Sequence, residues 1–191
     1  MQPALALLEF SSIARGIEAG DAMVKKASLD AVFSGVIQPG KYLVLIGGEV
    51  ANVEESAAAG EAVGGSSITD RMLLSDVHPD VVNSLGGARP VAAGRSVGIL
   101  ETTTVAAIVE AADAGVKTAA VELLELHFEG LGGKGYLIFG GDVAEVEAAV
   151  DAAAAKAGHR LEASVVIPQA HPEMLENLQA HSRFESRVRG N

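Results

Sequence analysis

The order of apolar and polar positions predicts the same set of elements twice along the chain. A short apolar strand (residues 4 to 10, and again 97 to 102) precedes a segment (about 12 to 27, and 104 to 119) whose apolar residues recur with the period of a helix. Two strands joined by a glycine-rich loop follow, at about 30 to 37 and 41 to 47, and at about 121 to 128 and 134 to 140. A second helix, a further strand (69 to 76, and 161 to 167) and a short last helix complete each set.

The order β-α-β-β-α-β is typical of the ferredoxin-like fold. It predicts an α+β protein with two tandem ferredoxin-like domains, in each of which the helices cover one face of a mainly antiparallel sheet. The second long helix of each set begins after a Gly-Gly turn. In the second set we expect Asp142 to cap this helix, with Glu145 supplying the return bond of a capping box.

Direct comparison of the two halves supports a tandem duplication. "QPGKYLVLIGGEVANVEE" (38 to 55) aligns with "LGGKGYLIFGGDVAEVEA" (131 to 148), and Glu9, Asp21 and Lys25 recur 92 positions later as Glu101, Asp113 and Lys117. The repeat continues from His78 to His171, where 171 − 78 = 93. The predicted domains are residues 1–90 and 95–180, split near 88 to 95, with a flexible polar tail at 181–191.

Composition excludes several classes of function. The 191 residues include no cysteine, so the chain has no disulfide, no thiolate metal site and no iron–sulfur cluster held by its own thiolates. A net charge of −11 disfavours binding to the phosphate backbone of a nucleic acid, so we expect no such partner. The start, "MQPALALLEF", lacks a basic region, and no apolar stretch approaches the roughly 20 residues that span a bilayer. We therefore expect an intracellular, soluble protein without membrane contact.

The glycine-rich stretch "EGLGGKGYLIFGG" (129 to 141) does not fit a nucleotide site. A phosphate-binding loop needs a glycine five positions before Gly133-Lys134 and a hydroxyl residue after the lysine, whereas Phe128 and Gly135 stand there. The residues alone are compatible with an ordinary glycine-rich hairpin turn at this stretch.

No catalytic or metal-binding set is readable elsewhere. The carboxylates Glu9 and Glu101 are paired by the duplication itself, and His78 and His171 lack the spacing of metal ligands. We expect no enzymatic activity, no metal and no cofactor.

The repeated residues resemble the shell proteins of bacterial microcompartments. The resemblance is carried by the "LLEF" or "ILET" strand, the helix end "GDAMVKKA" or "ADAGVKTA", the loop "VIQPGKYLVLIGGEV" or "EGLGGKGYLIFGGDV", and the segment "SDVHP" or "VVIPQAHP". It covers nearly the whole chain apart from the tail. Two copies without circular permutation resemble the tandem-domain class, whose trimers imitate the hexamers of single-domain shell proteins.

The resemblance implies a structural subunit in the shell of a microcompartment in the bacterial cytoplasm. It implies a homotrimeric, pseudohexameric tile that assembles with hexameric tiles and pentameric vertices and lets small metabolites through a central pore. In propanediol-utilisation shells a tandem protein holds an iron–sulfur cluster through a cysteine of its first pore loop; Gln38 occupies that position here, so no cluster is expected. A soluble, trimeric, ferredoxin-like regulator that binds a small molecule is the alternative.

The resemblance also assigns residues to the pore and to the tile edge. The pore-lining residues would be Gln38, Pro39, Gly40, Glu129, Gly130, Leu131, Gly132 and Gly133. The residues at the edge between tiles would be Lys25, Lys117, His78, Gln169 and His171. Gln169 replaces the arginine that the family commonly carries in this edge segment, which removes a charge and a fork of hydrogen-bond donors.

Overall fold

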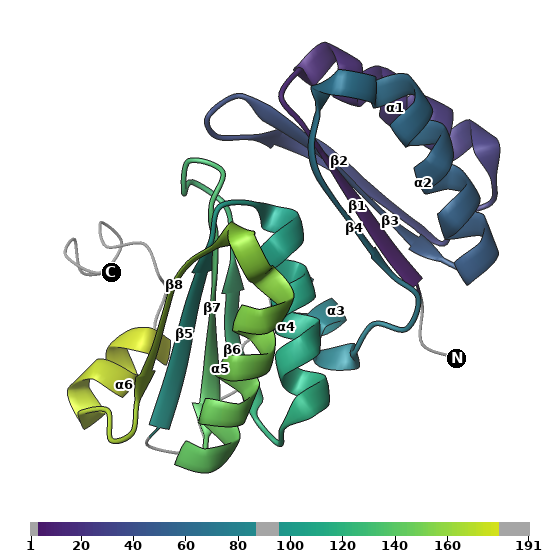
Figure 1. The fold of residues 1–191 in the computed structure, drawn as a ribbon. Helices are drawn as coiled ribbons and strands as arrows, with labels where there is room; N and C mark the ends of the chain where they lie inside the picture. Colours follow the sequence, from purple (N-terminus) through teal and green to yellow (C-terminus); the bar gives the residue numbers. More distant parts are fainter. Residues whose placement is uncertain (1–3, 87–95, 180–191) are drawn as a thin grey trace.

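The computed structural model describes residues 4–86 and 96–179, and these residues form two domains of the same topology (Figure 1). The first domain has β1 (Ala4–Phe10), α1 (Ile13–Lys26), β2 (Ala31–Ile37), β3 (Lys41–Gly48), α2 (Val50–Gly64), β4 (Ile68–Leu74) and α3 (Pro79–Leu85). The second has β5 (Ser96–Thr102), α4 (Val105–Thr118), β6 (Glu122–His127), β7 (Gly135–Gly141), α5 (Val143–Ala157), β8 (Leu161–Ile167) and α6 (Pro172–Gln179). The predicted order of elements is confirmed in both halves. The predicted split at 88 to 95 and the tail at 181 to 191 lie outside the described residues.

Each domain is a four-stranded antiparallel sheet with two long helices on one face. The strand orders are β2-β3-β1-β4 and β6-β7-β5-β8. Alternation along β1 sends Ala6, Leu8 and Phe10 toward α1 and α2, and sends Leu5 and Leu7 to the other side. We call this other side, which the two long helices of the same domain leave uncovered, the open face of the sheet.

Hydroxyl residues fix where the first helix of each domain begins. The Ser12 hydroxyl accepts a hydrogen bond from the Arg15 amide at 3.4 Å, and Thr104 accepts one from the Ala107 amide at 3.3 Å.

The capping box predicted at the start of α5 is wrong. Asp142 is the N-cap residue, but its side chain makes no capping hydrogen bond. The Glu145 carboxylate instead accepts a hydrogen bond from the Ala120 amide at 2.8 Å, at the turn between α4 and β6. The Glu145 carboxylate therefore accepts from an amide of the turn before β6, and not from the N-cap amide of its own helix.

Helix α4 joins the two domains because it is buried on both sides. It lies on its own sheet and α5, and its other side packs on β1 and β4 at the open face of the first sheet (Figure 1). Val105, Ile108 and Val109 are fully buried in one cluster with Leu7 and Met72 of the first domain. The hydrophobic core is therefore continuous across the junction of the domains.

Candidate functional site

The two glycine loops that were predicted to line a pore lie side by side. The β2–β3 loop holds Gln38, Pro39 and Gly40, and the β6–β7 loop holds residues 129 to 133; Figure 1 shows both between the domains, at the same end of the molecule. A Cβ atom added at Gly133 would lie 3.5 Å from Pro39 Cδ and 3.3 Å from Lys41 Nζ, so the loops are in contact.

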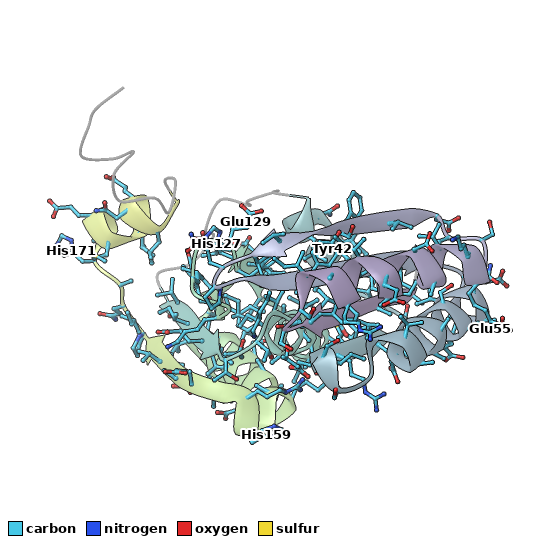
Figure 2. The ribbon with its side chains drawn as sticks, turned by 90° about the horizontal axis from the view of Figure 1, so that it is seen from above. Tyr42, Glu55, His127, Glu129, His159 and His171 are labelled. Atoms are coloured by element: carbon cyan, nitrogen blue, oxygen red, sulfur yellow. The ribbon has the colours of Figure 1, made fainter. Side chains whose placement is uncertain are left out.

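Most of both loops is open to solvent. Gln38, Pro39, Gly40, Glu129, Gly130 and Gly132 are exposed, Leu131 is half-buried and Gly133 is buried. Gly130, Gly132 and Gly133 have φ values of 73°, 67° and 89°, in the left-handed region that favours glycine. Figure 2 shows Glu129 beside the tip of the first-domain hairpin. The two loops thus form a glycine-rich surface with one exposed carboxylate, Glu129, and their described residues include no set of converging reactive groups.

The base of the first loop is tied to the junction between the domains by Glu9. This carboxylate is fully buried; one oxygen accepts a hydrogen bond from the Ala106 amide at 2.6 Å, and the other lies 3.4 Å from Lys41 Nζ. Burial raises the pKa of the Glu9 carboxyl, although the hydrogen bond from Ala106 and the charge of Lys41 act in the opposite direction. A carboxylate at the beginning of α4 also suits the positive end of the helix dipole.

A second group of charges crosses the same junction. Arg160 Nη1 lies 3.2 Å and 3.1 Å from the two carboxylate oxygens of Asp70, and its Nη2 donates to Glu110 at 2.6 Å. Lys156 Nζ lies 3.3 Å from the other oxygen of Glu110, and the Thr104 hydroxyl donates to Asp70. This group, which we call the junction network, holds the first sheet to α4 and to the end of α5.

Sequence reasoning missed the junction network, although the duplication carried a signal for it. Asp70 and Arg160 have the uncharged counterparts Ala163 and Ser67, each 93 positions away. These two charged residues are each present in only one copy of the repeat, at places where the two copies have different neighbours.

The candidate edge residues do not form one cluster. Lys25 is exposed and pairs with Asp21 at 2.6 Å, while Lys117 pairs with the buried Asp113 at 2.7 Å and also donates to the Asp76 carbonyl. The Asp113 carboxylate accepts a hydrogen bond from the His78 amide at 2.8 Å, so Lys117 belongs to the junction of the domains.

The histidines among these candidates act as local caps. The Nδ1 atoms of His78 and His171 accept from the amides of Asp80 and Glu173, at 3.3 Å and 3.4 Å. Gln169 is exposed, and His171 lies at the outer end of the second domain, far from Glu129 (Figure 2).

Among residues 4–86 and 96–179, no group of three or more histidine, aspartate or glutamate side chains could hold a metal ion. No helix within those ranges is both long and apolar enough to cross a bilayer.

Comparisons with known proteins give consistent results. The BMC domain family model matches residues 4–79 and 96–170. The bacterial microcompartment shell protein PduT of Citrobacter freundii is 40% identical over 177 residues, which cover 91% of this chain and 96% of that protein. A solved structure of a microcompartment protein from Desulfitobacterium hafniense has 40% identity and a TM-score of 0.81, and the match covers 92% of this chain and 99% of that one. The fused permuted hexameric shell protein of the RMM microcompartment shares the fold, with 20% identity and a TM-score of 0.58 over 81% of this chain and 83% of that one.

The raised pKa of Glu9 predicts a pH-dependent difference in stability between the wild type and Glu9→Gln. Because the folded state binds this proton more tightly than the unfolded chain does, the stability that it contributes is present below about pH 4.5 and is lost as the pH rises through the raised pKa. Glutamine does not titrate. Relative to the wild type, the variant should therefore gain free energy of unfolding as the pH rises from about 4.5 through the raised pKa, by about 1.4 kcal/mol for each unit by which the pKa is raised.

Urea unfolding at matched chain concentration across this pH range would measure the gain. Glu54→Gln, at an exposed position of α2, is the control and should show no comparable change. A difference between wild type and Glu9→Gln that stays constant with pH, or that falls as the pH rises, would contradict the assignment.

Proposed function

The chain belongs to the bacterial microcompartment (BMC) domain family and is a microcompartment shell protein with tandem domains, and from this premise we propose that three copies close into a pseudohexameric tile with a pore on its axis. In this proposal the subunit acts by assembly, exclusion and passage of small metabolites, and not by catalysis. The family consists of structural shell proteins. Nothing in the comparisons supports the alternative of a soluble regulator.

One observation carries the proposal. The contact between the domains pairs α4 with the open face of the first sheet, whereas the equivalent helix, α1, and the equivalent open face of the second sheet keep exposed apolar residues. Val105, Val109 and Val116 of α4 are buried in the cluster that also contains residues of the first domain, but their counterparts in α1, 92 positions earlier, are exposed. These counterparts are Ile13, Ile17 and Val24, with exposed fractions of 38%, 54% and 51%. Helix α1 thus presents an apolar stripe like the one that α4 buries.

The surface that would receive α1 of another copy is the open face of the second sheet. Met72 and Leu74 of β4 lie under α4 and are 2% and 8% exposed, whereas their counterparts Val165 and Ile167 of β8 are 52% and 39% exposed. Helix α1 of one copy fits the β8 face of the next as α4 fits the β4 face within the chain. Such a contact joins two different surfaces, so it builds a ring when the rotation closes. With two equivalent domains per chain, a pseudo-sixfold ring contains three chains.

Charge substitution on the α1 stripe should break the ring. Ile17→Asp would bury an unpaired carboxylate, which costs several kcal/mol, so we expect the trimer affinity to fall by at least about 100-fold. Analytical ultracentrifugation should then show the mass of one 19.5 kDa chain where the wild type shows three.

Val143→Asp is the matched control, because Val143 is 41% exposed on α5 and has no part in the proposed contact. A trimer of Ile17→Asp as stable as the wild type would rule out α1 as the interface.

The axis of this ring would pass beside the two glycine loops. Their contact with each other, their exposure and their glycines suit a place where several backbones approach closely. The residues proposed to line the pore are those of the two loops: Gln38, Pro39, Gly40, Glu129, Gly130, Leu131, Gly132 and Gly133. Gln38 would supply uncharged donors and acceptors, and Glu129 would disfavour anions.

Glu129→Gln should therefore increase the passage of anions relative to neutral molecules of the same size. Removing three carboxylates around a narrow axis should change this ratio by at least about threefold. Shells that enclose a reporter enzyme, supplied with an anionic or a neutral substrate, would measure it. Glu147→Gln, an exposed carboxylate of α5, is the control. An unchanged ratio in Glu129→Gln and unchanged flux in Gln38→Ala would together exclude these loops as the pore.

Contacts between tiles are proposed at Lys25, Lys117, His78, Gln169 and His171. Lys25 supports this assignment best, because its side chain is 73% exposed and bonds only with its own helix neighbour among the contacts described for it. Lys25→Ala should prevent hexagonal sheets in electron micrographs while the trimer mass stays unchanged. Lys26→Ala, at the next residue, is the control and should form sheets; sheets from Lys25→Ala would remove this residue from the edge.

A further inference from the structure

A cavity of about 620 Å³ lies between the open face of the first sheet and α3. Its walls are Leu5, Leu7, Leu43 and Leu45 of the sheet, Val82 and Leu85 of α3, and Phe128 from the base of the second glycine loop, among others. We propose that this cavity is a binding site for an uncharged, largely apolar small molecule. The inference goes beyond the proposed tile, which assigns no ligand to this face.

The second domain shows why the first is hollow here. In the first domain Gly35 of β2 pairs with Leu43 of β3; at the same point of the second domain His127 pairs with Tyr136. The two rings contact each other with their centroids 5.5 Å apart, so they occupy the volume that a glycine and a leucine leave free. A Cβ atom added at Gly35 would meet no heavy atom within 4 Å. The same position of the sheet is therefore occupied by two rings in the second domain and left open in the first.

The cavity is bounded by elements of both domains and stays open along β2. The open face of the first sheet receives α4 of the same chain, and α3 and Phe128 lie beside it, whereas Phe33 and Val36 of β2, which also line the cavity, are 66% and 60% exposed. The next copy would add its α1 to the other domain, at β8. That proposed contact does not use the walls of the cavity.

The lining decides the class of ligand. Its sheet and helix walls are mostly apolar, with Phe33 of β2 among the aliphatic residues, and its volume lies within the range of roughly 300 to 1,000 Å³ that is common for small-molecule sites. The ionisable groups among its lining residues are Asp30 and Glu129, both exposed carboxylates at the rim. Apolar walls favour a hydrocarbon or aromatic body, and two carboxylates at the entrance disfavour an anion.

The position of the cavity links it to the glycine loops. Ile37, which lines it, directly precedes Gln38 of the first loop, and Glu129 belongs to the second loop. An occupant would therefore contact the base of both loops.

Two fluorescent probes with the same aromatic skeleton test the site. N-phenyl-1-naphthylamine is uncharged, and 1-anilinonaphthalene-8-sulfonate adds one negative charge to it. We expect the neutral probe to bind once per chain and the anionic probe to bind at least about tenfold more weakly. Absence of a fluorescence rise with the neutral probe would overturn the site, and equal binding of both would overturn the ligand class. Measuring the mass of the assembly in solution in parallel separates this result from any failure of the trimer to form.

A substitution that fills the cavity locates the bound probe. Gly35→Leu places a side chain in open space on ordinary strand backbone, and it should weaken binding of the neutral probe at least about tenfold. Leu43→Tyr, which introduces the residue found in the second copy, should do the same. Ala58→Leu, exposed on α2, adds equal apolar surface elsewhere and should leave binding unchanged. Unaltered binding in both cavity variants would place the probe at another site.

Discussion

The packing of α4 between two sheets is the interaction on which the rest of the molecule depends. Val105, Ile108 and Val109 have no exposed surface because one side of the helix belongs to its own domain and the other to the preceding one. The first turn of the same helix receives the buried carboxylate of Glu9, which satisfies the Ala106 amide. Since neither domain could bury these groups alone, the two domains are expected to be stable only together. The same requirement leaves α1 and the β8 face exposed in the isolated chain.

The two copies of the junction differ in chemistry as well as in connectivity. Within the chain, Asp70 and Glu110 share Arg160 in a largely buried network. At the equivalent positions of the free surfaces stand Ala163, Ser67 and Glu18. Partly buried ion pairs add little net stability, but the loss of one partner costs several kcal/mol, so such networks select one arrangement. The network thus distinguishes the contact within a chain from the contact between chains, which relies on apolar packing.

Much of the fold could be predicted from the sequence, and the reasons are local. The helical period of residues 13 to 26 and the strand pair around Gly40 are set by neighbours in the chain, and the duplication doubled each signal. Features that failed or were missed involve distant donors. Glu145 bonds with Ala120 where a capping box was expected, and Glu9 caps a helix 97 residues away. No pattern along a single copy indicates which remote amide a carboxylate will satisfy, whereas comparison of the two copies shows where their surroundings differ.

Divergence between the copies also sets what a tandem ring can do at its axis. A ring of six identical domains must repeat every pore residue six times, so adding one carboxylate to the loop adds six charges. In the proposed trimer the loop with Gln38 alternates with the loop that carries Glu129, and a single substitution changes three positions. Charge close to a narrow axis is little screened by solvent, so this difference changes the barrier to anions strongly. Duplication therefore allows selectivity to be adjusted in smaller steps, while the second loop keeps Gly130, Gly132 and Gly133, whose positive φ values favour glycine.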